Sequence, residues 1–186
     1  SARLVHTMRE VHAVIFDLDN TLWDVGPVIL RAEHTMLGFL AERYPRVVEL
    51  HSLESMRDVR ARMAMDHPAM RHDFTWLRTQ ALLAHAREAG YPESMAYETF
   101  EVFFRARNDV VLYDDVLPAF EALAGRYRLF AISNGNADLA AIGLARLLGP
   151  DDVKPEPGPH QIADLTLFQG ERRLFEGRIH LPGGEP

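Results

Sequence analysis

The chain of 186 residues contains no cysteine. This absence excludes disulfide bonds, thiolate catalysis and cysteine-ligated metals together. No apolar run approaches the length of about 18 residues that spans a bilayer, so we expect no membrane partner. Residues 1–7 lack the apolar core of a signal peptide, and we therefore expect a cytoplasmic location.

Positive charge is also scarce, because the formal net charge at pH 7 is −7. Nucleic-acid affinity depends on neutralising phosphates with basic side chains, so we expect no nucleic-acid partner. Among the 20 basic residues, Lys154 is the only lysine. Either this is chance, or its position needs a compact ammonium that a planar guanidinium does not replace.

The arrangement of apolar segments predicts an α/β fold. Residues 11–16 form a short apolar run that is typical of a buried parallel strand, and residues 127–132 form a second. The segment 27–110 between them has helical periodicity and is too long for a simple strand crossover. We therefore predict a Rossmann-like parallel sheet built from residues 1–26 and 111–160, with a helical cap inserted at 27–110.

Capping residues and helix-ending signals set the expected helix boundaries. The predicted helices cover residues 28–44, 52–65, 74–89, 93–107, 115–124 and 137–148. From Gly149 onward glycine and proline become frequent, and no strand–helix period is evident. We expect residues 161–186 to form an atypical, disordered tail.

Asp17 and Asp19 follow the first predicted strand directly. Open α/β sheets bind their ligands at the carboxyl ends of the strands. At the turn after a strand, both carboxylates can converge on one site, giving a nucleophile and a proton donor, with the hydroxyl of Thr21 to hold the loop. A carboxylate nucleophile divides phosphate ester hydrolysis into two easier steps. The alternative is that both aspartates are turn or cap residues.

Ser133 and Asn134 occupy the matching position after the second predicted strand. Parallel neighbouring strands end at the same edge of a sheet, so we expect these side chains near Asp17. The alternative is a plain Ser-Asn-Gly turn.

Three segments together resemble the motifs of the haloacid dehalogenase superfamily. The first is Val-Ile-Phe-Asp17-Leu-Asp19-Asn-Thr21-Leu, the second is Phe-Ala-Ile-Ser133-Asn134-Gly, and the third is Val-Lys154-Pro-Glu-Pro. The resemblance covers residues 10–148 and a short patch around Lys154. It implies a phosphatase with a helical cap that closes over the site and selects the substrate.

The same resemblance implies a role for each matching residue. Asp17 is the nucleophile, Asp19 the general acid/base and Thr21 a loop anchor. Mg²⁺ is bound by Asp17 and by the backbone carbonyl of Asp19. The phosphoryl group receives hydrogen bonds from the side chains of Ser133 and Asn134, and the ammonium of Lys154 neutralises it. Because a halide leaving group needs no acid, the second aspartate disfavours dehalogenation and favours a phosphatase or phosphomutase.

Within the superfamily, the bacterial FMN phosphatases are the most similar group that we identify. The supporting segments are residues 26–33, 72–78 and 132–136. Trp23, Phe74 and Trp76 are candidates for stacking on a flat ring, and the alternative is helix packing. Arg31, Arg71 and Arg78 are candidates for contacting a second phosphate or ribityl oxygens, and the alternative is solvated surface.

The chain departs from the family pattern after the second motif. No apolar strand followed by Gly-Asp comes after Lys154, so the family's fourth motif and its metal-binding aspartate have no counterpart. The spacing between Ser133 and Lys154 is also short for the family. Truncation, a shortened relative and completion by a partner chain are three explanations, of which we favour the first.

We therefore expect a Mg²⁺-dependent phosphatase of a small phosphorylated metabolite, favouring FMN, with impaired turnover in this form. The alternatives are a phosphatase of another sugar phosphate or nucleotide, a phosphomutase, and a non-catalytic binding module. We expect a monomer or a homodimer.

Overall fold

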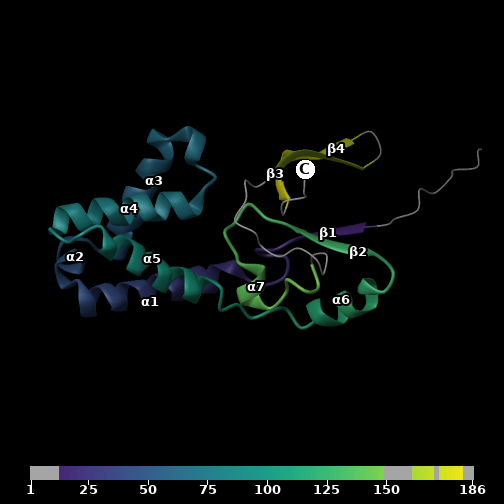
Figure 1. Cartoon of the computed structure of the whole chain (residues 1–186), viewed down its shortest axis with the longest axis horizontal. Helices are drawn as coiled ribbons and strands as arrows, with labels where there is room; N and C mark the ends of the chain where they lie inside the picture. Colours follow the sequence, from purple (N-terminus) through teal and green to yellow (C-terminus); the bar gives the residue numbers. More distant parts are fainter. Residues whose placement is uncertain (1–12, 149–160, 170–171, 182–186) are drawn as a thin grey trace, which may run out of the picture.

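The structure is a computed structural model that describes residues 13–148 and the backbone of residues 161–169 and 172–181 (Figure 1). The predicted third motif around Lys154 lies outside these residues. The chain forms two parts, a core around a parallel strand pair and a bundle of helices inserted after the first strand. The predicted α/β class with a helical insertion is confirmed.

The core is built around strands β1 (Ala13–Asp17) and β2 (Arg128–Ile132), which pair in parallel. Their register sets Asp17 opposite Ile132, so the segments that follow both strands leave the sheet at the same edge. Among the described residues this sheet has two strands, and Ile15 is 38% exposed. The strand pairing therefore brings the two strand-end segments together, and the side chain of Ile15 is partly exposed.

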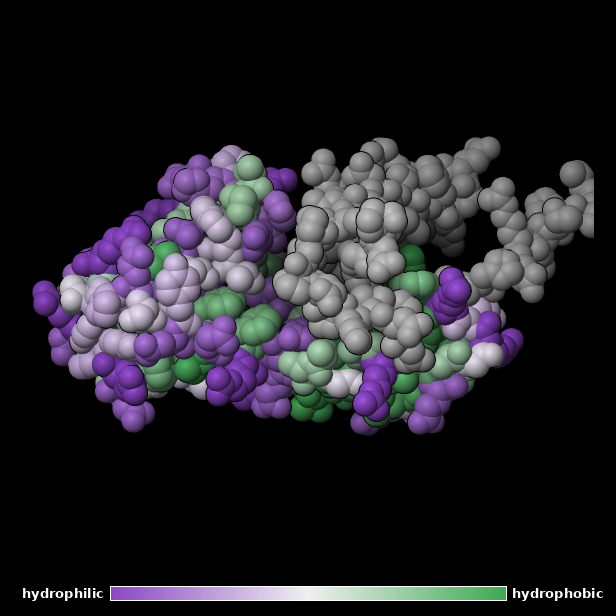
Figure 2. All heavy atoms as spheres, viewed as in Figure 1, coloured by the Kyte–Doolittle hydropathy of each residue, from purple (hydrophilic) through white to green (hydrophobic). Residues whose placement is uncertain are grey.

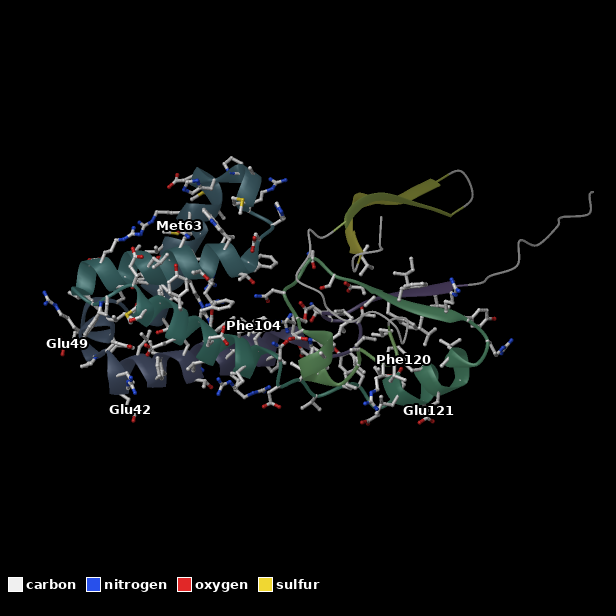
Figure 3. All side chains as sticks on the ribbon, viewed as in Figure 1. Glu42, Glu49, Met63, Phe104, Phe120 and Glu121 are labelled. Carbon is white, nitrogen blue, oxygen red and sulfur yellow. The ribbon has the colours of Figure 1, made fainter. Side chains whose placement is uncertain are left out.

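Helix α6 (Val116–Ala124) lies against the strand pair. Phe120 is buried and meets Phe16 of β1 edge-to-face, with ring centroids 4.8 Å apart. The next residue, Glu121, is exposed and points away from the strands (Figure 3). Burial of one face of α6 thus completes the core that supports the strand ends.

The cap consists of five helices with an apolar core of their own. They are α1 (Val25–Arg43), α2 (Pro45–Leu50), α3 (Leu53–Asp66), α4 (Phe74–Ala89) and α5 (Ser94–Arg107). A short 3₁₀ helix, η1 (Pro68–Met70), follows α3. Residues such as Met36, Leu40, Leu82 and Phe103 form the buried centre. Hydrophilic side chains cover much of the visible outer face of the cap (Figure 2).

The capping residues explain why the predicted cap helices were nearly correct. Ser52 accepts a hydrogen bond from the amide of Ser55 at the start of α3, and Asp73 accepts one from the amide of Trp76 at the start of α4. Gly90 ends α4 with a left-handed backbone, φ 75°, a conformation that costs glycine little. Local side-chain chemistry therefore defines these boundaries.

Two helix predictions need correction. The first predicted helix was expected to end at Tyr44 with no helix directly after it, but α2 begins at the next residue. Pro45 is compatible with this helix because it lies in the first turn, where an amide hydrogen has no partner within the helix. The helix predicted for 137–148 is limited to α7 (Leu139–Ile142). Gly143 adopts φ 87° and ends α7 after about one turn.

The disordered tail predicted for residues 161–186 is also corrected at residues 161–169 and 172–181, and the rest of it lies outside the described residues. Strands β3 (Gln161–Gln169) and β4 (Arg172–Leu181) pair antiparallel in a separate sheet. Apolar and polar residues alternate over residues 163–167 and 178–181, a pattern with the two-residue period of a strand. The many glycines and prolines around them concealed this pattern. Along the described helices, none has the combination of length and apolar character that crossing a membrane requires.

Candidate active site

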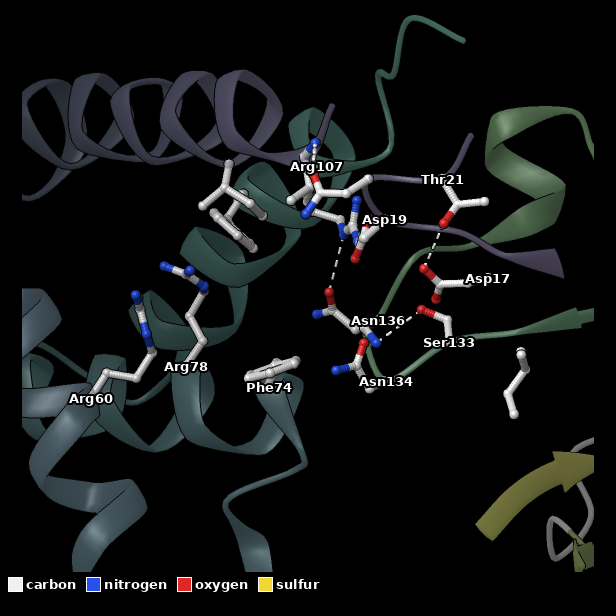
Figure 4. Close-up of a pocket in the computed structure, with 16 residues that line it drawn as sticks. Asp17, Asp19, Thr21, Arg60, Phe74, Arg78, Arg107, Ser133, Asn134 and Asn136 are labelled. Atoms are coloured by element: carbon white, nitrogen blue, oxygen red, sulfur yellow. Dashed lines mark hydrogen bonds and ion pairs between the residues drawn. The ribbon is translucent and has the colours of Figure 1, made fainter. Parts of the chain in front are cut away.

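One cavity of about 950 Å³ lies between the ends of the core strands and the cap (Figure 4). The core contributes residues from the β1 and β2 ends, and the cap contributes residues from α1, α3, α4 and α5. The lining residues are Asp17, Asp19, Asn20, Thr21, Val25, Ile29, Arg60, Phe74, Arg78, Phe103, Arg107, Ile132, Ser133, Asn134, Gly135 and Asn136. The cavity therefore joins the two predicted strand-end motifs with the cap.

Asp17 is the last residue of β1 and is exposed to the cavity. One carboxylate oxygen, Oδ2, accepts a hydrogen bond of 2.9 Å from the hydroxyl of Thr21. Within residues 13–148, no side-chain hydrogen bond engages the other oxygen. Asp17 and Ser133 lie near one another in Figure 4, in agreement with the β1–β2 register. Within the described residues, Asp17 thus has one carboxylate oxygen held by Thr21 and one without a side-chain hydrogen bond.

Asp19 lies two residues further along and is held from two sides. Its Oδ1 accepts hydrogen bonds from Trp23 Nε1 at 2.9 Å and from Arg107 Nη2 at 2.8 Å. Arg107 Nη2 also donates to Oδ2 at 2.7 Å. Asn20 has a positive φ of 62°, which asparagine tolerates better than most residues and which helps the chain to turn after Asp19. Asp17 and Asp19 consequently line one cavity, as the sequence analysis required.

The loop after β2 forms the opposite wall. Ser133 Oγ accepts a hydrogen bond of 2.9 Å from the amide of Gly135. A Cβ on Gly135 would lie 2.5 Å from Asp19 Oδ2, so only glycine allows the carboxylate to come this close. Asn136 Oδ1 accepts a hydrogen bond from Arg107 Nε at 3.2 Å. Arg107 therefore connects the β2 loop, Asp19 and the cap.

The cap wall carries a cluster of buried charge. Glu33 on α1 is 1% exposed and forms ion pairs with Arg57, Arg60 and Arg78. Burial alone would raise the pKa of Glu33, but the hydrogen bond from Arg57 and the charges of Arg78 and Arg60 outweigh it, so the pKa lies below its ordinary value. Three guanidinium groups surround one carboxylate, so the cluster has a net positive charge.

Arg78 links this charge cluster to the cavity. Its guanidinium carbon lies 3.5 Å from the centroid of the Phe103 ring, a cation–π contact. Burial, followed by the repulsion of Arg60, lowers the pKa of Arg78 to about 9, so Arg78 stays charged at neutral pH. Arg60 and Arg78 both line the cavity on the cap side, close to Phe74 (Figure 4). The cavity thus has acidic residues at the core end and basic residues at the cap end.

Of the residues predicted to contact substrate, Arg78 and Phe74 line the cavity, and four others do not, namely Trp23, Trp76, Arg31 and Arg71. Trp23 is fully buried and its indole donates to Asp19, so it cannot stack on a ligand ring. Trp76 packs edge-to-face on His67, with centroids 5.2 Å apart. Arg31 pairs with Asp109 beside a separate shallow hollow. Aromatic and basic composition alone did not distinguish packing and surface residues from cavity residues.

The sequence analysis did not single out Arg107, Gly135, Asn136 or Arg60, although each lines the cavity. Gly135 is the last residue of the second motif and Asn136 directly follows it, which was the available signal. Arg107 lies 88 residues from Asp19, and Arg60 lies on a helix outside every predicted motif. No local pattern marks either arginine.

The donor atoms at the core end fit Mg²⁺ in part. Asp17 has one carboxylate oxygen without a side-chain hydrogen bond, and the backbone carbonyl of Asp19 accepts no backbone hydrogen bond within residues 13–148. The Asp19 carboxylate is engaged by Arg107 and Trp23, so only its carbonyl is available. Mg²⁺ commonly combines one or two carboxylates with waters and substrate phosphate. These two donors would hold it.

Comparison with known proteins places these observations in context. A family model described as haloacid dehalogenase-like hydrolase matches residues 11–165. The chain is 30% identical to 5-amino-6-(5-phospho-D-ribitylamino)uracil phosphatase YigB of Escherichia coli (strain K12), over 98% of this chain and 76% of that protein.

Solved structures were also matched. A 2-haloacid dehalogenase from Pseudomonas syringae pv. Tomato DC3000 is 36% identical, with a TM-score of 0.70, over 75% of this chain and 62% of that chain. The magnesium-bound HAD-hydrolase YfnB of Bacillus subtilis is 16% identical, with a TM-score of 0.44, over 75% of this chain and 63% of that one. The chain therefore spans less than two thirds of either solved structure.

Proposed function

Because this chain belongs to the haloacid dehalogenase-like hydrolase family, we propose that it is a phosphatase that hydrolyses phosphate monoesters through a phosphoaspartate at Asp17. The observation that carries the proposal is the pair of carboxylates at the β1 end. One oxygen of Asp17 has no side-chain hydrogen bond from residues 13–148, and Asp19 is oriented by Arg107 and Trp23 in the same cavity. Two carboxylates in these different settings suit two different roles.

In the first step, the free oxygen of Asp17 attacks phosphorus and the bond to the ester oxygen breaks. Asp19 gives a proton to that oxygen as the alcohol leaves. In the second step, Asp19 takes a proton from water, which attacks phosphorus and releases Asp17. Thr21 holds the second oxygen of Asp17 in place at 2.9 Å. Ser133 and Asn134 line the opposite side and donate hydrogen bonds to the phosphoryl oxygens.

Mg²⁺, bound by Asp17 and the Asp19 carbonyl, would offset the repulsion between the carboxylate and the phosphate. Asp17 and Asp19 are the only acidic residues among the described ones that line the cavity. With so few carboxylates, we propose weak Mg²⁺ affinity and reduced turnover for this chain as it stands.

For the substrate we propose a small phosphorylated metabolite with a flat ring, favouring FMN. The E. coli relative is named for a substrate in which a phosphorylated ribityl chain is attached to uracil. FMN has the same combination of a ribityl phosphate and a flat ring. Phe74, with Arg60 and Arg78, gives the cap end an aromatic face and two positive charges for such a ring and its polar substituents. Other sugar phosphates or nucleotides are the alternatives for this site.

A second candidate activity is dehalogenation, favoured by the 36% identity to the Pseudomonas syringae protein. It would use the same nucleophile but would leave Asp19 without a role, because a halide leaves without a proton. A third candidate is a binding module that keeps the scaffold without turnover.

One assay separates these candidates. The chain is incubated with Mg²⁺ and with FMN, the ribitylaminouracil phosphate, a sugar phosphate, a nucleotide or a 2-haloacid, and phosphate or halide release is measured. We expect slow phosphate release that is greatest with FMN or the ribityl compound. Halide release without phosphate release would support the dehalogenase. Binding of FMN without any release would support the binding module. Phosphate release at a rate normal for the family would refute the proposed reduction in turnover.

A further inference from the structure

The cap contains a second group of side chains that can bind a metal ion, and none of them lines the cavity. They are His51, His85 and Glu88. His51 directly follows α2, and the other two lie three residues apart on α4. Residues at this spacing share one face of a helix. We propose that these three side chains bind a divalent transition cation such as Zn²⁺ and thereby cross-link α2 and α4.

The three ligand atoms are already grouped. One nitrogen from each imidazole and one oxygen of Glu88 all lie within 4.8 Å of one another. His51 Nε2 lies 3.1 Å from Glu88 Oε2, and the centroids of the two imidazole rings lie 4.2 Å apart. Tetrahedral zinc, with bonds of about 2.0–2.2 Å, requires ligand atoms about 3.3 Å apart. His51 and Glu88 are close to this separation, and a nitrogen of His85 lies within 4.8 Å of both of their ligand atoms.

Two buried nitrogens point independently to a ligand. His85 is 2% exposed, and its Nε2 has no hydrogen-bond partner within residues 13–148. The Nε2 atom of His51 is likewise buried and lacks a hydrogen bond of acceptable geometry there. Buried polar atoms in folded proteins are nearly always satisfied. A cation coordinated by both nitrogens would satisfy the two buried atoms together.

The donor set selects the class of cation. Two imidazoles and one carboxylate suit zinc and similar transition metals, whereas magnesium and calcium prefer oxygen donors. The Glu88 side chain is 60% exposed, so solvent reaches the site and water can take the fourth position. The site is distinct from the proposed Mg²⁺ site, because its ligands belong entirely to the cap.

The test is a Zn²⁺ titration of the full chain without an affinity tag, in excess Mg²⁺ so that the oxygen-donor site is occupied. Calorimetry is expected to show one equivalent of Zn²⁺ bound with a dissociation constant in the micromolar range or tighter. Thermal unfolding is expected to shift upward with Zn²⁺. Co²⁺ in place of Zn²⁺ is expected to give the visible absorption of a tetrahedral site.

Variants decide whether these residues are the ligands. His51 is partly exposed and Glu88 is largely exposed. His51→Gln and Glu88→Gln are each expected to weaken Zn²⁺ binding by about tenfold or more. His85→Asn is expected to abolish the high-affinity equivalent. His34→Gln, an exposed histidine on α1, is the matched control and is expected to bind as the parent does.

Absence of Zn²⁺ binding by the parent chain would overturn the proposal. Zn²⁺ binding that is unchanged in both His51→Gln and Glu88→Gln would also overturn it, since the ion would then lie elsewhere. Phosphate release with Mg²⁺ is expected to be the same for Glu88→Gln and the parent, so the outcome is independent of the proposed catalytic function.

Discussion

Arg107 Nη2 lies 2.8 Å from Oδ1 and 2.7 Å from Oδ2 of Asp19, although 88 residues separate the two side chains. Arg107 is the last residue of α5, and its side chain is 1% exposed. The same guanidinium donates to Asn136 in the loop after β2. The cap therefore sets the orientation of the carboxylate that we propose as the general acid/base, in addition to lining the substrate cavity.

Replacement of Arg107 tests this positioning role. We expect Arg107→Met to lower kcat for phosphate release by about 10–100-fold with little change in KM, as is typical when a supporting partner of a functional residue is lost. Arg107→Lys is expected to recover part of the loss because it keeps the charge. Arg105→Met, exposed on the same helix, is the control. An unchanged kcat in a folded Arg107→Met protein would contradict the role.

Gly135→Ala tests the close approach between the β2 loop and Asp19. The added Cβ would lie 2.5 Å from Asp19 Oδ2 and 3.2 Å from Ser133 Oγ, so the carboxylate has to move. We expect a loss of kcat of about tenfold or more, since misplaced catalytic groups are costly.

The control for Gly135→Ala is Gly38→Ala on α1, where a Cβ meets nothing within 4 Å. This variant is expected to keep full activity and to gain up to about 1 kcal/mol of stability from better helix propensity. Equal activities of the two alanine variants would show that Asp19 tolerates displacement.

Asp17→Asn is expected to reduce phosphate release by more than about 10³-fold, because an amide cannot form the phosphoaspartate. Asp24→Asn is the matched control. Asp24 Oδ1 accepts a hydrogen bond from the amide of Gly26 at the start of α1, and asparagine caps helices about as well as aspartate. Phosphate release by Asp17→Asn at the parent rate would rule out this carboxylate as the nucleophile.

Glu33 is expected to make the stability of the cap dependent on pH. Its folded-state pKa lies below the ordinary value of 4.5, so folding favours the ionised form. The stabilisation is complete above the unfolded-state pKa and is lost as the pH falls through the folded-state value. Glu33→Gln leaves three arginines without their buried partner and is expected to cost about 3–5 kcal/mol near neutral pH.

Urea unfolding of the parent chain and Glu33→Gln at a series of pH values measures this effect. The difference in unfolding free energy between them is expected to shrink as the solution is acidified below the ordinary carboxylate range. Glu42→Gln, exposed on the same helix, corrects for general effects of charge. A difference that stays constant with pH would show that the pKa of Glu33 is not shifted by folding.

Much of the fold followed from local patterns in the sequence. Ser52, Asp73 and Gly90 define helix boundaries through hydrogen bonds and backbone geometry that involve only neighbouring residues. The predicted helix after β2 was too long because the apolar pattern continues past Gly143, whose left-handed backbone ends α7. The antiparallel pair of β3 and β4 was missed because the glycine and proline content of this part of the sequence outweighed a short two-residue alternation.

The sequence by itself determined the core end of the site. Two recognisable strands end in short motifs that contain Asp17, Asp19, Thr21, Ser133 and Asn134, and parallel pairing of the strands brings these ends together. Only the tertiary structure decided the rest. It buried Trp23 as a support for Asp19, brought Arg107 to the same carboxylate, and assembled the Glu33 cluster beside the cavity. These contacts join residues that no local pattern links, because the helix packing of the cap sets which distant side chains meet.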